Sequence, residues 1–266
     1  GVFYADRGSF FLPRVRVDSS LLKNLILSLK LNPKQAVMEL EAKGLNLLES
    51  AQALGLIPMG SRFSGVDSLS LRVILEGKRH GSFVAKLALH DLVFEYSDAN
   101  AMGEKLAIHA EMKGEMDLST EYIATETSIH IDRGEILYDR FYVDLNVNPF
   151  ISAFKGNYRL SEKSLEVSSL KAGLKDILMF HVAGTAAYKI RDQRFQFTLK
   201  TPAIPLRPVF QHVIMEPFQT EKPFLSTLNV GGAVSLDLEL TGDGKHWVAI
   251  GACAWHDGEL LSPENG

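Results

Sequence analysis

The sequence has few of the residues that build disulfides, metal cages and membrane-spanning helices. Its 266 residues include one cysteine, Cys253, which excludes an internal disulfide and a zinc site made of cysteines. No apolar run approaches the ~20 residues that a membrane-spanning helix needs. The net charge is -4, and Lys and Arg are scattered instead of forming a basic stripe. We therefore expect no nucleic acid as a partner.

The motifs of common enzymes are missing as well. The chain contains no G-x-S-x-G, Walker A or dinucleotide-binding loop. His109 with Glu111, and His130 with Asp132, lie two apart on expected strands, so each pair would face one side and form half of a metal site. We interpret these histidines as solvent-facing residues of alternating strands. The sequence thus predicts no enzymatic activity, no catalytic residue, no metal and no cofactor.

Residues 1–64 predict a helical segment that packs on a sheet or caps it. Asp18–Ser20 provides N-cap candidates, and Asn32–Pro33 is typical of a second helix start. Apolar residues then recur at helical spacing from Leu21 to Leu54. We expect two amphipathic α-helices between residues 19 and 54.

From residue 65 to residue 261 the apolar period changes to two, which predicts antiparallel strands with one apolar and one wet face. A phase slip at His90–Asp91 predicts a β-bulge or a strand break. Short polar turns at 161–163, 191–193 and 242–244 predict hairpins. The expected fold class is mainly antiparallel β, in a curved or groove-like sheet or a sandwich, with the N-terminal pair of helices.

Three further units follow the helical segment. Residues 65–201 form a first β unit, and residues 202–230, with five of the ten prolines, form a crossover that cannot be a central strand. A short helix is expected at Arg207–Met215. Residues 231–266 form a C-terminal β repeat unit of the same sheet, whose end repeats the pattern of Ser128–Leu137. A recurrent hairpin turn containing glycine would produce the same repeat.

A family resemblance rests on the order of strands and turns near the C-terminus. Gly231–Gly242, Gly251 and Asp257–Leu261 form an alternating strand, a glycine turn, a second strand and a D-G turn followed by two aliphatic residues. This order resembles the closing pattern of AsmA-like envelope proteins, which include the YdbH and TamB types. Asp132–Leu137 and the strands and turns of 154–206 fit the same style.

The resemblance implies a periplasmic protein of the Gram-negative cell envelope, anchored in the inner membrane by a segment outside this sequence. It implies a non-enzymatic β-groove that binds or conducts phospholipid, or another acyl lipid, in outer-membrane homeostasis. Further envelope proteins are the other partners that it implies. A sheet curled into a trough is consistent with the alternation, because one apolar face would then point inward toward acyl chains.

The predicted lipid-contacting residues are the apolar members of three alternating runs, and Trp247 and Trp255 are further aromatic candidates. The three runs comprise Phe141, Val143, Leu145, Val147, Phe195, Phe197, Leu199, Val234, Leu236, Leu238 and Leu240. The same residues would fill the core of a β-sandwich. Alternation therefore leaves two functions open, which are a lipid-binding groove and a structural or protein-interaction module of the envelope with a filled core.

Overall fold

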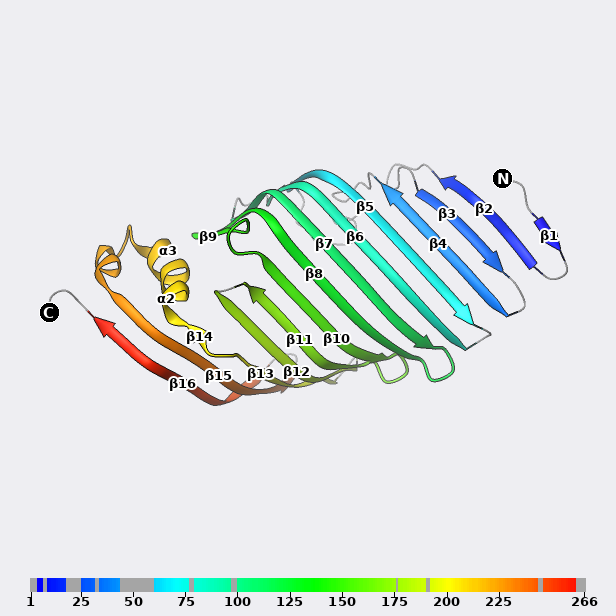
Figure 1. Ribbon diagram of the computed structural model, residues 1–266. Coiled ribbons are helices and arrows are strands. Elements are labelled where there is room, and N and C mark those ends of the chain that lie inside the picture. The colour runs from blue at the N-terminus through cyan, green and yellow to red at the C-terminus, as the bar shows by residue number, and fades with distance from the viewer. Residues whose placement is uncertain are drawn as a thin grey trace.

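Over the residues that the structure describes, the protein forms one open, curved antiparallel sheet of 16 strands (Figure 1). The computed structural model describes residues 4–6, 9–17, 25–31, 34–43, 60–76, 79–96, 100–175, 177–189, 192–243 and 246–261. The strands are β1 (Tyr4–Asp6), β2 (Ser9–Val17), β3 (Leu25–Leu31), β4 (Gln35–Lys43), β5 (Arg62–Glu76), β6 (His80–Glu95), β7 (Ala101–Asp117), β8 (Tyr122–Tyr138), β9 (Phe141–Asp144), β10 (Phe150–Arg159), β11 (Ser164–Leu174), β12 (Leu178–Lys189), β13 (Asp192–Lys200), β14 (Ile204–Pro205), β15 (Asn229–Asp243) and β16 (Trp247–Leu261).

The strand order is close to a meander. Neighbours in sequence pair with each other from β1 to β8 and from β10 to β13, while β9 folds back on β8 alone. β13 pairs with β15, which also pairs with β14 and β16. The predicted antiparallel hairpins around residues 161–163 and 242–244 are confirmed by these pairings. The alternative of a two-sheet sandwich is wrong, since the described strands all belong to one sheet.

The predicted N-terminal pair of helices is also wrong where the structure describes it. Residues 25–31 and 35–43 are the strands β3 and β4, and residues 18–24 and 44–59 lie outside the described residues. Leucine, alanine, methionine and glutamate favour helices, yet Leu25, Leu27, Leu29 and Leu31 also alternate at period two. Pairing with the neighbouring strands overrides the local helical preference, as tertiary context does for propensities in general.

The crossover contains a helix, as expected. α2 (Leu206–Val209), the π-helical η1 (Phe210–Met215) and α3 (Glu216–Phe218) run on without a break as one helix of 13 residues. A 3-10 turn, η2 (Pro223–Thr227), then leads into β15. The predicted helix at Arg207–Met215 is therefore confirmed and is extended by α3. In the described ranges, no helix has the length and apolarity to cross a membrane.

The run from Phe141 to Val147, which looks like the cleanest strand in the sequence, ends as a strand at Asp144. The Asp144 carboxylate accepts hydrogen bonds from the backbone N–H and the side-chain amide of Asn146, at 2.9 and 2.7 Å. Its carbonyl accepts one from the N–H of Asn148 at 3.0 Å. These bonds close a turn in which aspartate competes with the strand ladder for backbone donors. Leu145 points inward from this turn.

Among the described residues, a cluster of buried leucines lies beside this turn. Leu89, Leu92, Leu106 and Leu145 form one buried cluster, with Leu106 and Leu145 each 1% exposed. The half-buried residues packed around it come from β6, β7, β8, β9, β10 and β11. The turn after β9 therefore covers part of one face of the sheet and closes it at the ends of these strands.

The predicted irregularity at His90–Asp91 is a β-bulge. The pairing of β6 with β7 shifts between Leu89 and Leu92, and Asp91 adopts a φ of 50°. On β8, Gly134 has a φ of 106°, and a Cβ there would lie 2.5 Å from the Glu104 carbonyl oxygen. Bulges of this kind bend strands and increase their twist, so they contribute to the curvature of the sheet.

The core assignment gives a stability prediction. Replacing Leu145 by Ala should lower the free energy of unfolding by about 2–5 kcal/mol, because it leaves a cavity among buried leucines. Val147→Ala is the matched control, since Val147 lies on the same turn but is 71% exposed, and it should change stability by less than about 0.5 kcal/mol. Chemical denaturation measures both, and equal effects would contradict the packing of this turn.

Candidate functional site

The two faces of the sheet differ sharply in polarity. Residues directly opposite each other on paired strands point to the same face. One row crosses twelve strands from β3 to β16 and contains a single polar side chain, that of Thr127. The row is Leu27, Leu40, Leu71, Ala85, Met112, Thr127, Phe154, Leu170, Val182, Leu199, Leu238 and Gly251. The side of the sheet to which this row belongs is called the apolar face below.

The apolar face lies on the inside of the curve. The helix α2–η1–α3 contacts β15 through α2, and β9 through η1 and α3, and Figure 1 shows it between these two parts of the sheet. Phe218 of the helix contacts Phe141 of β9, with ring centroids 6.3 Å apart. Figure 1 shows the sheet curving around the helix, so that its apolar face lines a trough.

The side chains that line the trough are half-buried at most positions. No residue of the twelve-strand row is buried, and Met112 is 38% exposed. In the described part of the chain, the elements that lie over the apolar face are the helix and the turn after β9, both at one end. Contiguous apolar surface left accessible in this way marks a binding site more often than a random surface feature.

Glycines keep the floor of the trough low. Five phenylalanine rings lie against a glycine of the same or the neighbouring strand, and a Cβ on that glycine would come within 2.8 Å of a ring atom. The five pairs are Phe83 with Gly114, Phe94 with Gly103, Phe154 with Gly156, Phe195 with Gly242, and Phe197 with Gly184. Because glycine has no side chain, each ring can lie along the sheet instead of standing up from it. The rings then offer large apolar contact area without filling the trough.

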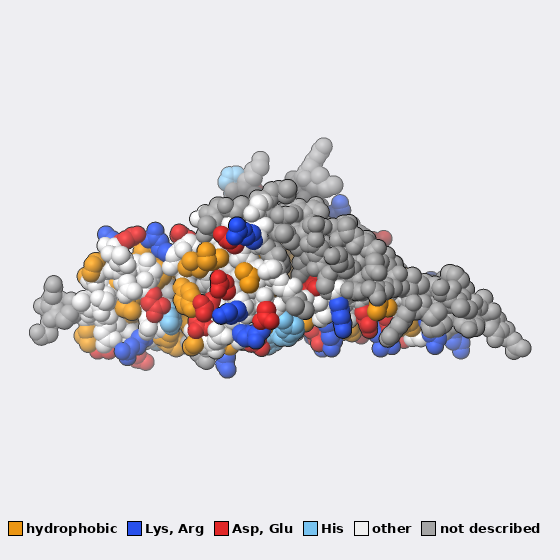
Figure 2. Space-filling view, turned by 90° about the horizontal axis from the view of Figure 1, so that it is seen from above, with side chains coloured by type: hydrophobic (Ala, Val, Ile, Leu, Met, Phe, Trp, Pro, Cys, Tyr) orange, Lys and Arg blue, Asp and Glu red, His pale blue; other side chains and the backbone are white. Residues whose placement is uncertain are grey.

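The opposite face carries ion pairs between neighbouring strands. Figure 2 shows side chains of both charge signs interspersed with apolar ones over the described part of the surface. Such exposed pairs contribute about 0–1 kcal/mol each, but they keep this face wetted. The cross-strand pairs include Arg72–Glu39 (3.2 Å), Lys86–Glu111 (3.3 Å), Lys113–Glu126 (3.1 Å), Lys155–Glu126 (2.9 Å) and Lys200–Asp237 (2.8 Å).

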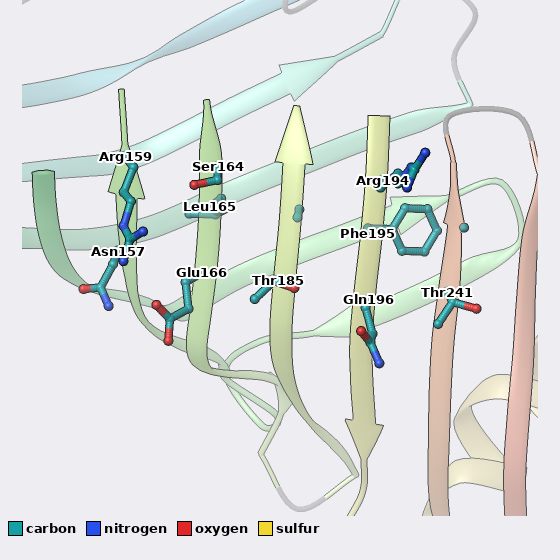
Figure 3. Close-up of a pocket in the computed structure, with 12 residues that line it drawn as sticks. Asn157, Arg159, Ser164, Leu165, Glu166, Thr185, Arg194, Phe195, Gln196 and Thr241 are labelled. Atoms are coloured by element: carbon teal, nitrogen blue, oxygen red, sulfur yellow. The ribbon is translucent and has the colours of Figure 1, made fainter. Parts of the chain in front are cut away.

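A shallow hollow of about 560 Å³ also lies on the polar face (Figure 3). Its polar lining includes one row across five strands, whose side chains stand side by side without converging on a point, and Arg159, Ser164 and Arg194 line it as well. This arrangement differs from an active site, in which polar groups converge. The row is Asn157, Glu166, Thr185, Gln196 and Thr241.

The predicted lipid-contacting residues divide into two groups. The seven on β13 and β15 are half-buried and share the apolar face, and so do Phe141 and Val143 near the helix. Leu145 instead belongs to the buried core, and Val147 is 71% exposed. Trp247 and Trp255, on the outermost strand β16, are 68% and 52% exposed.

The histidines considered as half of a metal site lie on the polar face. His109 and His130 are directly opposite each other on β7 and β8, and the His90 ring packs edge-on against His109 at 5.3 Å. All three are exposed, and Glu111 is paired with Lys86. Over the stretches that the structure describes, no group of three or more His, Cys, Asp or Glu side chains could hold a metal ion.

Glu126 is the centre of the ion-pair network. Hydrogen bonds from Lys155 and from Lys113, together with their positive charge, hold the pKa of the Glu126 carboxyl below its usual range. The same contact raises the pKa of Lys155. A lowered carboxyl pKa stabilises the folded state above the ordinary pKa of glutamate. The stabilisation is lost as the pH falls through the lowered value.

Removing one of the two lysines that pair with Glu126 should reverse the lowering of its pKa. Lys155→Met should raise the pKa of Glu126, as followed by the NMR titration of its carboxyl carbon. Lys171→Met is the matched control on the neighbouring strand β11, and it should leave the titration of Glu126 unchanged. A pKa of Glu126 that does not respond to Lys155→Met would contradict the network.

No protein-family model matches the chain, and no curated protein and no solved structure is similar to it. The resemblance to AsmA-like proteins therefore stays a prediction.

Proposed function

We propose that this protein is a non-enzymatic lipid-binding protein of the bacterial envelope, whose trough holds or conducts the acyl chains of phospholipid. In this proposal the protein lies in the periplasm, and a segment outside this sequence anchors it in the inner membrane. The role follows from the AsmA-like order of strands and turns and from the trough. The single observation that carries it is the apolar row across twelve strands, half-exposed on the inside of the curve.

Acyl chains suit this surface on energetic grounds. Each methylene that leaves water for apolar contact contributes about 0.8 kcal/mol. Ten methylenes laid along the trough would contribute about 8 kcal/mol before the cost of immobilising the lipid. Burial of the apolar face under the lipid contributes further free energy of binding, since its side chains lose contact with water. The polar face, with its ion pairs, remains in solvent.

Adjacent residues of β13 provide a matched test. Phe197 lies on the apolar face and Thr198 on the polar face. Phe197→Asp places a carboxylate in contact with bound chains and should lower the phospholipid that co-purifies with the protein about tenfold. Thr198→Asp adds the same charge on the opposite face and should change the amount of co-purified phospholipid little.

The amount of bound phospholipid follows from extraction and phosphate assay, with the fold of both variants checked by circular dichroism. Equal retention of lipid by the two folded variants would argue against the trough as the binding site.

A second candidate function is an interaction module of the envelope, and the free edge of β16 favours it. The nine residues from Trp247 to Trp255 carry no charge, and all of β16 is exposed. On the polar side, β16 places Ile250 beside Glu239 and Ala252 beside Asp237, so this strand is apolar on both faces. Natural edge strands are normally protected by charges, prolines or bulges. The run from Trp247 to Trp255 has no charge, proline or bulge, so it suits the addition of a strand from a second copy.

This second candidate predicts self-association. Two β16 strands pairing antiparallel about Gly251 would set apolar residues opposite apolar residues throughout the uncharged run. Ile250→Lys should then abolish a dimer seen by sedimentation velocity. Val84→Lys, at an exposed apolar position of the polar face away from the edge, should retain it. A wild-type protein that stays monomeric at all concentrations would exclude this mode.

A further inference from the structure

A separate cavity lies between the helix and the end of the trough. Its volume is about 370 Å³, within the range of about 300–1,000 Å³ typical of small-molecule sites. The apolar walls come from the helix, from β9 with the turn that follows it, and from the connection between β11 and β12. They consist of Phe141, Val143, Val147, Leu174, Ile177 and Val213.

The cavity is continuous with the apolar face. Val143 and Leu174 line it and also pack against the buried leucine cluster. Leu174 belongs to a second apolar row, parallel to the first, which crosses β6, β7, β8, β10, β11 and β12. This row is Leu89, Ile108, Ile131, Phe150, Leu174 and Leu178. Along β11, Leu170, Ala172 and Leu174 share the apolar face, so this strand joins the twelve-strand row to the cavity through apolar side chains.

The helix is held over the cavity at its C-terminal end. Phe218 contacts both the Phe141 ring and the Arg140 guanidinium, whose Cζ is 4.8 Å from the Phe218 centroid. Arg140 also pairs with Glu221 at 3.1 Å and with Asp139 at 3.6 Å. At the other end α2 contacts β15. The helix thus bridges the two walls of the trough and closes the cavity on that side.

The charges around the cavity determine which end of a lipid can enter. Two carboxylates, Asp144 and Glu216, line it together with Tyr142, Asn148 and His212. His212 Nδ1 lies 2.9 Å from a Glu216 oxygen, so the imidazole is engaged with that carboxylate. Among the described residues that line the cavity, none is Lys or Arg. A phosphate or fatty-acid carboxylate would meet like charge here, whereas a methyl end would meet apolar walls.

We propose that the cavity receives the methyl end of one acyl chain, with the headgroup of that lipid held back in the trough. The helix α2–η1–α3 acts as an end wall that fixes the orientation of the chain. This inference rests on the proposed lipid-binding function and adds to it a site, a ligand class and a polarity of insertion.

Two photoactivatable phospholipids test the polarity directly. Both are phosphatidylglycerols with one diazirine-bearing acyl chain, and they differ in whether the diazirine sits at the methyl end or next to the ester. After loading of the intact protein and irradiation, mass spectrometry identifies the labelled peptides. The methyl-end probe should label the peptides that contain Val213 and residues 141–148, and the ester-end probe should label the trough strands instead. Equal labelling of the helix by both probes would overturn the proposal.

Tryptophan substitutions that fill the cavity test the same proposal, with a tryptophan on the polar face as the matched control. Val213→Trp and Val147→Trp each place a ring at a partly exposed cavity position, 39% and 71% exposed in the native protein, where the fold has room for it. Each should lower methyl-end labelling of the helix about tenfold. Thr185→Trp adds the same ring in the hollow of the polar face and should leave labelling unchanged. Undiminished labelling in both folded cavity variants would overturn the proposal.

Two failures are distinguishable. A wild-type protein that retains phospholipid on the trough strands but shows no methyl-end labelling near the helix would refute the cavity site alone. A wild-type protein that binds neither probe would refute the lipid-binding function, and the cavity proposal with it.

Discussion

The structure depends on one constraint, which is that strand alternation places most apolar side chains of a single-layer sheet on one face. Backbone N–H and C=O groups are satisfied by neighbouring strands wherever a strand has a partner on both sides. The hydrophobic driving force, in contrast, needs something to cover the apolar face. In the described part of the chain, the helix and the turn after β9 meet this need at one end, where Leu145 is buried. Elsewhere the sheet curves, so that apolar side chains approach one another across the trough while remaining partly accessible.

Curvature links this constraint to the placement of the helix. Bulges such as the one at Asp91 bend the strands, and glycines such as Gly114 and Gly184 let aromatic rings lie along the floor. The curve brings β9 and β15 close enough for one helix of 13 residues to contact both. Phe218 and Arg140 then hold the helix in place at this end of the trough. The trough is therefore closed and acidic at the helix and apolar along its length, so the two ends of an amphiphile would meet different surroundings in it.

Much of the sheet could be predicted from the sequence, because alternation is a local property. The period-two runs of β13 and β15, the bulge at Asp91 and the helix near Arg207 each follow from a few neighbouring residues. The pattern misleads where two periods coexist. Residues 25–43 satisfy both helical and strand spacing, and only pairing with β2 and β5 decides between them. In the same way, the turn at Asp144 competes with the strand that the alternation of Phe141 to Val147 predicts.

The cavity under the helix could not be predicted from the sequence. Val143, Leu174 and Val213 are far apart in the chain, and only the curvature of the sheet brings them together. Curvature depends on bulges and twist accumulated over many strands, so no local sequence motif predicts it. The assignment of Leu145 to the core instead of the trough has the same origin. What local reasoning does provide is the polarity of each face, and that polarity is the basis for the proposed ligand.

Phospholipid bound in the trough can be detected by native mass spectrometry of the protein, released gently from the cells that make it. We expect mass additions that correspond to intact phospholipid and that disappear when the protein is unfolded. A fully folded protein that carries no lipid, and that takes up none from phospholipid vesicles, would contradict this expectation.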